Sequence, residues 1–74
     1  MTSDPTIADF NKAIELAPNS ADYYCNRGLA YYYNDQIDLA IVDFNRVMNI
    51  STDSELVASA KKMLDILQQL KALK

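Results

Sequence analysis

Apolar residues recur at three- and four-residue steps along most of the chain, which is the period of an amphipathic α-helix. A first apolar stripe consists of Ile7, Phe10, Ala13, Ile14 and Ala17. A second face has Ile41, Phe44, Val47 and Met48 at the same steps, followed by Ser51. A third consists of Leu56, Ala60, Met63, Leu64, Leu67 and Leu70. The pattern predicts an all-α fold of four helices, at about 5–17, 21–33, 37–50 and 53–72.

Helix-start and helix-stop residues separate these stripes. Asp4-Pro5 offers a capping carboxylate followed by proline at the first helical position, and Pro18-Asn19-Ser20 ends the first helix. Asn34-Asp35-Gln36 interrupts the middle of the chain, and Asn or Asp adopts a left-handed turn conformation more readily than most residues. Thr52 and Glu55 have the spacing of a capping box that opens the last helix.

Two segments of the sequence repeat without a gap. TIADFNKAIELAPNS, at 6–20, aligns with AIVDFNRVMNISTDS, at 40–54, at an offset of 34 residues. The alignment pairs Asp9 with Asp43 and Phe10 with Phe44. Self-similarity at a fixed period of this size is typical of stacked helical repeats.

The helix between these segments makes the repeat more specific. Tyr24, Gly28 and Tyr31 share one face of the first helix of residues 21–54, and Ala40 and Phe44 follow on the second. This arrangement resembles the 34-residue tetratricopeptide repeat, a helix–turn–helix unit, although Arg27 replaces its usual leucine and Thr52 its usual proline. Val47 is a conservative change from the pattern. The resemblance implies antiparallel helix pairs stacked into an α-solenoid fragment.

The resemblance also divides the chain into parts of one domain that spans 1–74. Residues 5–20 are interpreted as the second helix of a partial repeat, 21–54 as one complete repeat, and 55–74 as a C-terminal capping helix. Glycine in a helix costs about 1 kcal/mol relative to alanine, so Gly28 is expected to allow close packing between helices. Tyr24 and Tyr31 are expected to fill the core around this contact.

The remaining side of the first helix is the candidate binding surface. In tetratricopeptide arrays this side lines a concave groove where extended peptides bind. The corresponding residues here are Asp22, Cys25, Asn26, Leu29, Tyr32 and Tyr33. Rigid aromatics suit such a role because they bury area at low entropic cost. The alternative is that Tyr32 and Tyr33 are surface tyrosines, or that they pack on a neighbouring repeat.

Asn26 alone suggests a narrower ligand. In the family, an asparagine at this place belongs to a clamp for the acidic tails of chaperones. That clamp also needs cationic residues on the following first helix, where this sequence has Leu56 and Ala60. The sequence therefore disfavours an acidic tail as the ligand of this chain alone.

Composition narrows the function further. The net charge is −3, and residues 1–55 hold nine acids against three bases, which disfavours nucleic acid as a partner. The chain has one cysteine and no histidine, so it forms no internal disulfide and no ordinary zinc site, and we expect no cofactor. Cys25 suits a reducing, cytoplasmic setting. No apolar run reaches the roughly 18 residues that a membrane span needs.

No catalytic set is visible in the sequence. The usual base, histidine, is missing, and the repeated Asp9 and Asp43 are interpreted as solvated helix surface. We therefore expect a non-catalytic module that binds a peptide or partner protein.

The main alternative is a homodimer. It could be domain-exchanged through the turn at Asp35, where the family usually has glycine. A further alternative is contact of the last helix with an anionic surface through Lys61, Lys62, Lys71 and Lys74.

Overall fold

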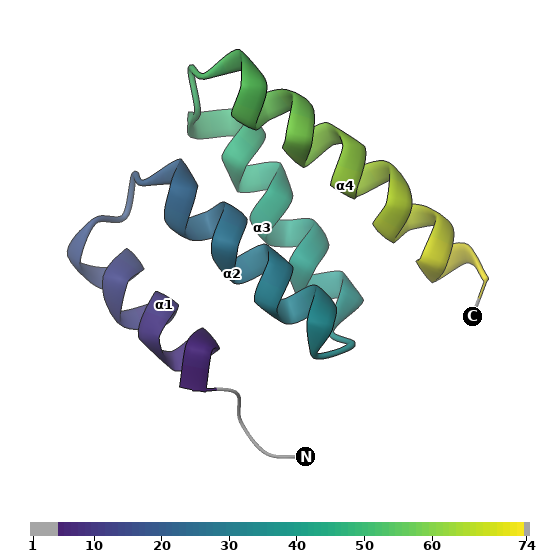
Figure 1. Cartoon of the computed structure of the whole chain (residues 1–74), viewed down its shortest axis with the longest axis horizontal. Coiled ribbons are helices and arrows are strands. Elements are labelled where there is room, and N and C mark those ends of the chain that lie inside the picture. The colour runs from purple at the N-terminus through teal and green to yellow at the C-terminus, as the bar shows by residue number, and fades with distance from the viewer. Residues whose placement is uncertain (1–4, 74) are drawn as a thin grey trace.

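The computed structural model describes residues 5–73, which form four α-helices in a row (Figure 1). They are α1 (Pro5–Leu16), α2 (Ala21–Tyr33), α3 (Ile37–Ile50) and α4 (Ser54–Ala72). Each helix packs against its neighbour in sequence, and Figure 1 shows α2 and α4 running in the same direction in front of α3. The all-α fold is confirmed, and each helix begins and ends within one residue of its predicted bounds. The predicted capping residue Asp4 lies outside the described residues.

The turn between α2 and α3 closes without a glycine. Asp35 takes a left-handed conformation with φ 62°. The Gln36 amide donates to the Tyr31 carbonyl at 2.8 Å, and the Asp35 amide donates to the Tyr32 carbonyl at 3.1 Å. These two bonds satisfy carbonyls that the end of α2 would otherwise leave unpaired. The two helices therefore fold back on each other within one chain.

The start of α4 corrects one prediction. Asp53, and not Thr52, is the capping residue, and its carboxylate accepts a hydrogen bond from the Glu55 amide at 3.0 Å. Thr52 and Asp53 are both residue types that cap helices, and the helix begins one position later than the capping-box spacing implied. The predicted box is therefore wrong, although the helix start is nearly unchanged.

Helix α3 forms the centre of the core because α2 and α4 cover it from two sides. Ala40, Phe44 and Val47 are fully buried on α3. Ala60 and Leu67 are fully buried on α4, opposite them. Met48, which the sequence placed on the buried stripe, is 36% exposed. With two neighbouring helices, the buried face of α3 is centred closer to Ala40 and Val47, which leaves Met48 at its edge.

Gly28 allows the closest contact between α2 and α3. A Cβ atom built on Gly28 would lie 3.0 Å from Cε2 of the Phe44 ring and 3.2 Å from its Cδ2. That spacing is tighter than an ordinary van der Waals contact, so a side chain at this position would have to displace the ring. Tyr24 is buried beside this contact, and Tyr31 is half-buried against the same core. The predicted packing role of this face is confirmed.

Helix α1 is covered less than its counterpart α3. Phe10 is the repeat equivalent of Phe44, yet it is only half-buried. The reason is that α1 packs against α2 alone, whereas α3 has a helix on each side. Ile7, Ala13 and Ile14 are also half-buried along the same stripe.

Candidate partner-binding face

The six predicted binding residues lie along the side of α2 that does not hold Gly28. Cys25, Leu29 and Tyr32 are half-buried and pack against the edge of the core. The other three predicted residues, Asp22, Asn26 and Tyr33, are exposed. The tyrosine rings at the end of α2 lie side by side, with the centroids of Tyr32 and Tyr33 5.3 Å apart. The helix thus presents a mixed apolar and polar strip whose largest exposed ring is Tyr33.

Helix α4 adds residues that the sequence interpretation did not include. The 34-residue period continues from α2 into α4 and pairs Asp22 with Leu56, Leu29 with Met63, and Tyr32 with Ile66. Leu56 and Met63 are half-buried against the core, and Ile66 is 39% exposed. Extending the repeat alignment by one helix would have identified them. We call the six α2 residues together with Leu56, Met63 and Ile66 the α2–α4 face.

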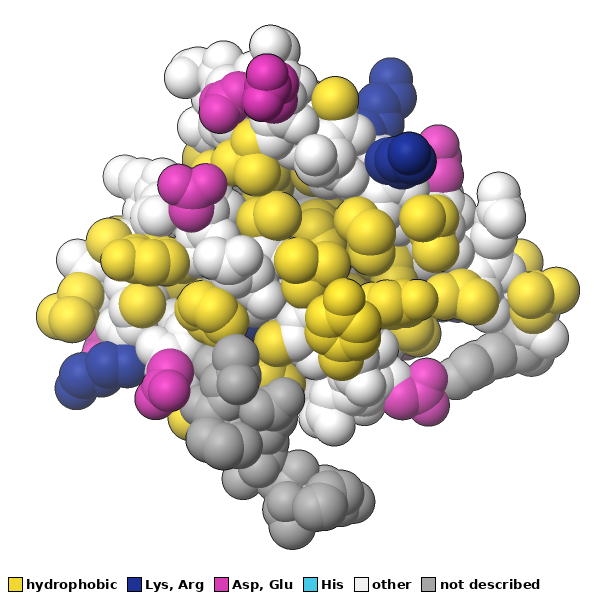
Figure 2. All heavy atoms as spheres, viewed as in Figure 1, with side chains coloured by type: hydrophobic (Ala, Val, Ile, Leu, Met, Phe, Trp, Pro, Cys, Tyr) yellow, Lys and Arg dark blue, Asp and Glu magenta, His cyan; other side chains and the backbone are white. Residues whose placement is uncertain are grey.

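Figure 2 looks onto the molecule from the side on which α2 and α4 lie in front of α3. Hydrophobic side chains gather across the middle of this view, while Asp and Glu side chains lie at several points around them. Lys and Arg side chains lie mostly at the outline. A continuous apolar surface with a polar rim is the composition expected of a protein-binding patch.

The only cysteine of the chain is poorly suited to covalent chemistry. Burial of Cys25, together with the nearby Asp22 carboxylate, raises the pKa of the Cys25 thiol above its usual value. The thiolate is the nucleophilic form, so this environment keeps the group protonated at neutral pH. Cys25 therefore contributes a small, weakly polar contact surface.

A buried ion pair lies on the opposite side of α2 from the α2–α4 face. Arg27 donates from Nε and Nη2 to the two carboxylate oxygens of Asp43, at 2.7 and 2.8 Å. Its third nitrogen, Nη1, donates to Asn11 Oδ1 at 2.8 Å, so one side chain joins α1, α2 and α3. The hydrogen bond to Asp43 raises the pKa of Arg27, so the guanidinium keeps its charge.

The burial of this pair corrects the interpretation of Asp43. The carboxylate side chain is 1% exposed and is not solvated surface, unlike its repeat equivalent Asp9, which is exposed. The Arg27 guanidinium also lies 5.5 Å from the Tyr24 ring centroid and 5.6 Å from that of Tyr31. This packing explains how an arginine occupies a position where the repeat pattern has leucine. The Asp43 carboxylate neutralises the charge of the guanidinium, and the rings of Tyr24 and Tyr31 pack close to it.

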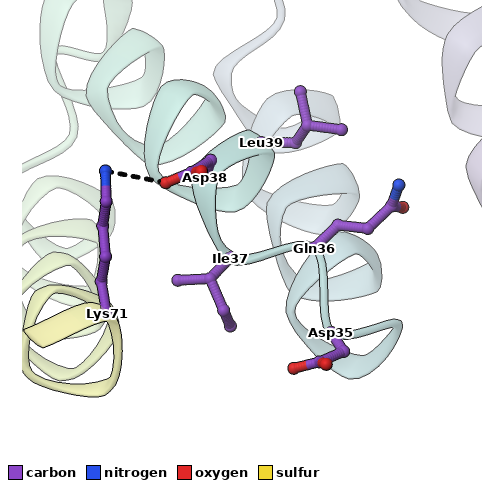
Figure 3. Close-up of a pocket in the computed structure, with 6 residues that line it drawn as sticks. All are labelled: Asp35, Gln36, Ile37, Asp38, Leu39 and Lys71. Atoms are coloured by element: carbon purple, nitrogen blue, oxygen red, sulfur yellow. Dashed lines mark ion pairs between the residues drawn. The ribbon is translucent and has the colours of Figure 1, made fainter. Parts of the chain in front are cut away.

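An open pocket of about 310 Å³ lies between the start of α3, with the turn before it, and the end of α4 (Figure 3). It is lined by Asp35, Gln36, Ile37, Asp38, Leu39 and Lys71. Lys71 and Asp38 point toward each other and form an ion pair at 2.8 Å, with both side chains largely exposed.

Other classes of site receive little support within residues 5–73. These residues contain no cluster of three or more Cys, Asp or Glu side chains that could hold a metal ion. In the same range, no helix has both the length and the apolar character needed to cross a membrane. What the described residues do offer is a surface for contact with another molecule.

Antiparallel helix pairs at a fixed period, with a first-helix glycine packed on a second-helix phenylalanine, define a helical-repeat protein. Comparison with protein-family models agrees. The tetratricopeptide repeat model matches residues 21–54, and a second TPR repeat model matches residues 6–35. The chain therefore belongs to the tetratricopeptide repeat family. Repeats of this family are non-catalytic modules that generally mediate protein–protein interaction.

One curated relative shares this region of sequence. The mitochondrial import receptor subunit TOM70 of Homo sapiens is 34% identical over 61 residues, which is 82% of this chain and 10% of the relative. The chain thus spans about a tenth of the length of that protein. No solved structure gives a significant match.

Proposed function

We propose that this chain binds a segment of a partner protein on the α2–α4 face. The observation that carries the proposal is the apolar strip left on this face after the core is complete. Leu29, Tyr32 and Met63 are half-buried, while Tyr33 and Ile66 extend outward. Exposed aromatic and aliphatic side chains on rigid helices are the type of residue that supplies most of the binding energy in protein interfaces.

The polar residues on the face suit orientation of a ligand. Asn26 is exposed one turn before Leu29 and offers both an amide donor and a carbonyl acceptor. Such a group can form hydrogen bonds with the backbone of an extended peptide, whatever side chains the peptide carries. Specificity then comes from the apolar and charged residues around Asn26.

A peptide-library selection tests this function without assuming the class of ligand. Peptides selected from a random displayed library should shift the amide resonances of the α2–α4 face when titrated into the labelled protein. Tyr33→Ser combined with Ile66→Gln should weaken their binding at least about tenfold, since these are the most exposed large apolar side chains of the face. The matched control is Leu16→Gln, at an apolar side chain that is 77% exposed on α1 and should leave binding unchanged.

The proposal fails if no peptide is enriched over repeated selections. It also fails if the selected peptides shift residues elsewhere and bind the double variant as well as the original protein.

A second candidate function is self-association through α1. The half-buried Phe10, beside Ile7 and Ile14, favours it, because the equivalent Phe44 is fully covered. A second copy that packed on this stripe would remove the same surface from water. Phe10→Ser should then lower the mass measured in solution without changing peptide binding.

A further inference from the structure

We propose that one side of α1, formed by Asp9, Phe10 and Ala13, binds a helix of a partner protein that carries the same residue pattern as α2. We call these three residues the open side of α1. The pattern is a basic residue followed directly by glycine, with one aromatic residue three positions before the basic residue and another three positions after the glycine. This surface is separate from the α2–α4 face, so the inference goes beyond the proposed function and does not rest on it.

The open side is the part of α1 that is less buried than its repeat equivalent on α3. The 34-residue offset gives the pairs Asp9 and Asp43, Phe10 and Phe44, and Ala13 and Val47. Each α3 residue of these pairs is at most 1% exposed, whereas Asp9 is exposed and Phe10 and Ala13 are half-buried. Ile7 does not follow this trend, because it is half-buried and so is its equivalent Ile41. The difference in burial therefore belongs to one side of α1.

The side of α1 that contacts α2 is a different one. Asn11 accepts a hydrogen bond from Arg27 at 2.8 Å, and Ile14 packs against the core. At 100° per residue, Asp9 lies about 160° around the helix from Asn11. Among the described helices α1 packs against α2 alone, and Figure 1 shows α1 at one end of the row. The open side of α1 is therefore left uncovered by the other helices of residues 5–73.

Helix α3 shows what covers the equivalent side of a repeat in this chain. Arg27 of α2 pairs with the Asp43 carboxylate, and Gly28 lies directly against the Phe44 ring. The rings of α2 on either side of Gly28 fill the space around this contact. The same Asp-Phe pair stands at the equivalent positions of α1. A helix placed on the open side therefore meets the same two groups, a carboxylate and an adjacent ring.

These two groups select the partner helix. A partner without a cation would bury the Asp9 carboxylate unpaired, which is strongly unfavourable. A side chain in place of the glycine would hold the partner helix away from the Phe10 ring or force the ring to move. The basic residue and the glycine thus set the specificity, and the aromatic residues add apolar contact area.

A second copy of this chain offers no free helix with this pattern within residues 5–73. Its α2 is already packed on its own α3. On α4 the equivalent pair is Lys61 and Lys62, so a long side chain stands where α2 has Gly28. Contact between two α1 helices would bring two Asp9 carboxylates into one interface, and like charges disfavour it. These mismatches favour a different protein as the occupant.

Three helical peptides of about 16 residues test the proposal on the whole chain, a length sufficient to cover α1. They share an alanine-rich host with two tyrosines at the spacing found in α2. Between the tyrosines the first peptide carries Arg-Gly, the second Glu-Gly and the third Arg-Leu. Leucine favours a helix more than glycine does, so weaker binding of the third peptide would not reflect a lost helix.

Each peptide is titrated into the labelled protein and followed by amide chemical shifts and hydrogen exchange. The Arg-Gly peptide should shift the amides of Asp9, Phe10 and Ala13 and slow the exchange of α1. The Glu-Gly and Arg-Leu peptides should each bind at least about tenfold more weakly.

A charge reversal locates the cation. With Asp9→Arg, the Glu-Gly peptide should bind at least about tenfold more tightly than the Arg-Gly peptide, which reverses the original order. The matched control is Glu15→Arg, the same change at an exposed acid about 120° around α1 from Asp9. It should preserve the original order and change the affinity of the Arg-Gly peptide by no more than about twofold. Far-ultraviolet circular dichroism should show the original helix content in both variants, because both side chains are exposed.

Four results would overturn the proposal. The first is that the Arg-Gly peptide leaves the open side unshifted, and the second is that the Glu-Gly or Arg-Leu peptide binds it equally well. The third is that the peptide shifts α3 instead, which would mean that it replaces α2. The fourth is a mass of two chains without peptide, together with concentration-dependent shifts of the open side, which would identify a second copy as the occupant. The function of the α2–α4 face is decided separately by the library selection.

Discussion

At the scale of single residues, Arg27 and Asp43 are the pair on which the packing of three helices depends. Removing one partner of a buried pair leaves an uncompensated charge, which costs about 3–5 kcal/mol. Arg27→Leu restores the residue usual in the repeat but leaves the Asp43 carboxylate buried alone. We expect it to lower the free energy of unfolding by about 3 kcal/mol, measured by chemical denaturation with far-ultraviolet circular dichroism.

The double variant distinguishes lost charge pairing from lost volume. Arg27→Leu combined with Asp43→Leu removes both charges and should recover most of the lost stability, because apolar replacements of buried pairs are often neutral or better. Asn11→Ala is the control. It removes the one exposed hydrogen bond from the same guanidinium and should cost no more than about 1 kcal/mol. A single Arg27→Leu variant as stable as the original chain would contradict this role.

Gly28 gives the second prediction at this scale. Gly28→Ala gains about 1 kcal/mol of helix propensity but places a methyl group 3.0 Å from the Phe44 ring. Overpacking of a dense core costs about 1–3 kcal/mol, so the net change in the free energy of unfolding should be a loss of about 1 kcal/mol. Gly28→Leu, with three more carbon atoms to place, should unfold the helix pair. Thermal melting of both variants measures this order.

A double-mutant cycle tests the cause. In a background of Phe44→Leu, which frees space beside Gly28, the change Gly28→Ala should be neutral or stabilising. A Gly28→Ala variant that is more stable than the original chain would show that the ring moves without cost.

At the scale of elements, the caps show which helix boundaries depend on side chains. Asp53→Ala removes the carboxylate that accepts from the Glu55 amide, and we expect it to lower the free energy of unfolding by about 1 kcal/mol. Thr52→Ala changes the neighbouring residue that lacks this role and should stay within about 0.5 kcal/mol of the original chain. Urea denaturation compares the two. Equal losses, or a larger one for Thr52→Ala, would contradict the assignment of the cap.

The same elements show how far the sequence predicts the fold. Helix bounds followed from apolar periodicity and from proline, asparagine and aspartate at the breaks, because these signals are local. The contact of Gly28 with Phe44 followed from the repeat pattern. Asp43 did not, because its partner is 16 residues away and a charged residue on a helix is ordinarily solvated. Thr52 and Asp53 were equivalent as caps in sequence, and only the position of the chain after α3 separates them.

For the candidate site, the sequence predicted one side and missed the other. The residues on α2 followed from the resemblance to a known repeat, whereas α4 departs from that repeat and was interpreted as a cap only. The structure places α4 beside α2 in the same direction, and this arrangement adds Leu56, Met63 and Ile66 to the candidate site. The pocket has no local signal, because Asp38 and Lys71 are far apart in sequence and meet only through the stacking of α4 on α3.

At the scale of the whole molecule, stability is expected to be uneven. Helix α1 has 12 residues and packs against α2 alone, and a helix of this length is marginal without tertiary contacts. Helices α2, α3 and α4 share the buried core around Phe44. Amide hydrogen exchange should therefore be fastest in α1, with protection of α3 close to that of global unfolding.

The concentration dependence of this exchange tests whether the chain acts alone or as a dimer. If the chain works as a monomeric binding module, the exchange rates of α1 amides should be the same at low and high protein concentration. Association through the Phe10 stripe would instead cover α1 and slow its exchange as concentration rises. We expect the first result, with light scattering at the same concentrations giving the mass of one chain. Protection of α1 that increases with concentration and is lost in Phe10→Ser would favour self-association as the function of this surface, while leaving the α2–α4 face open to a partner.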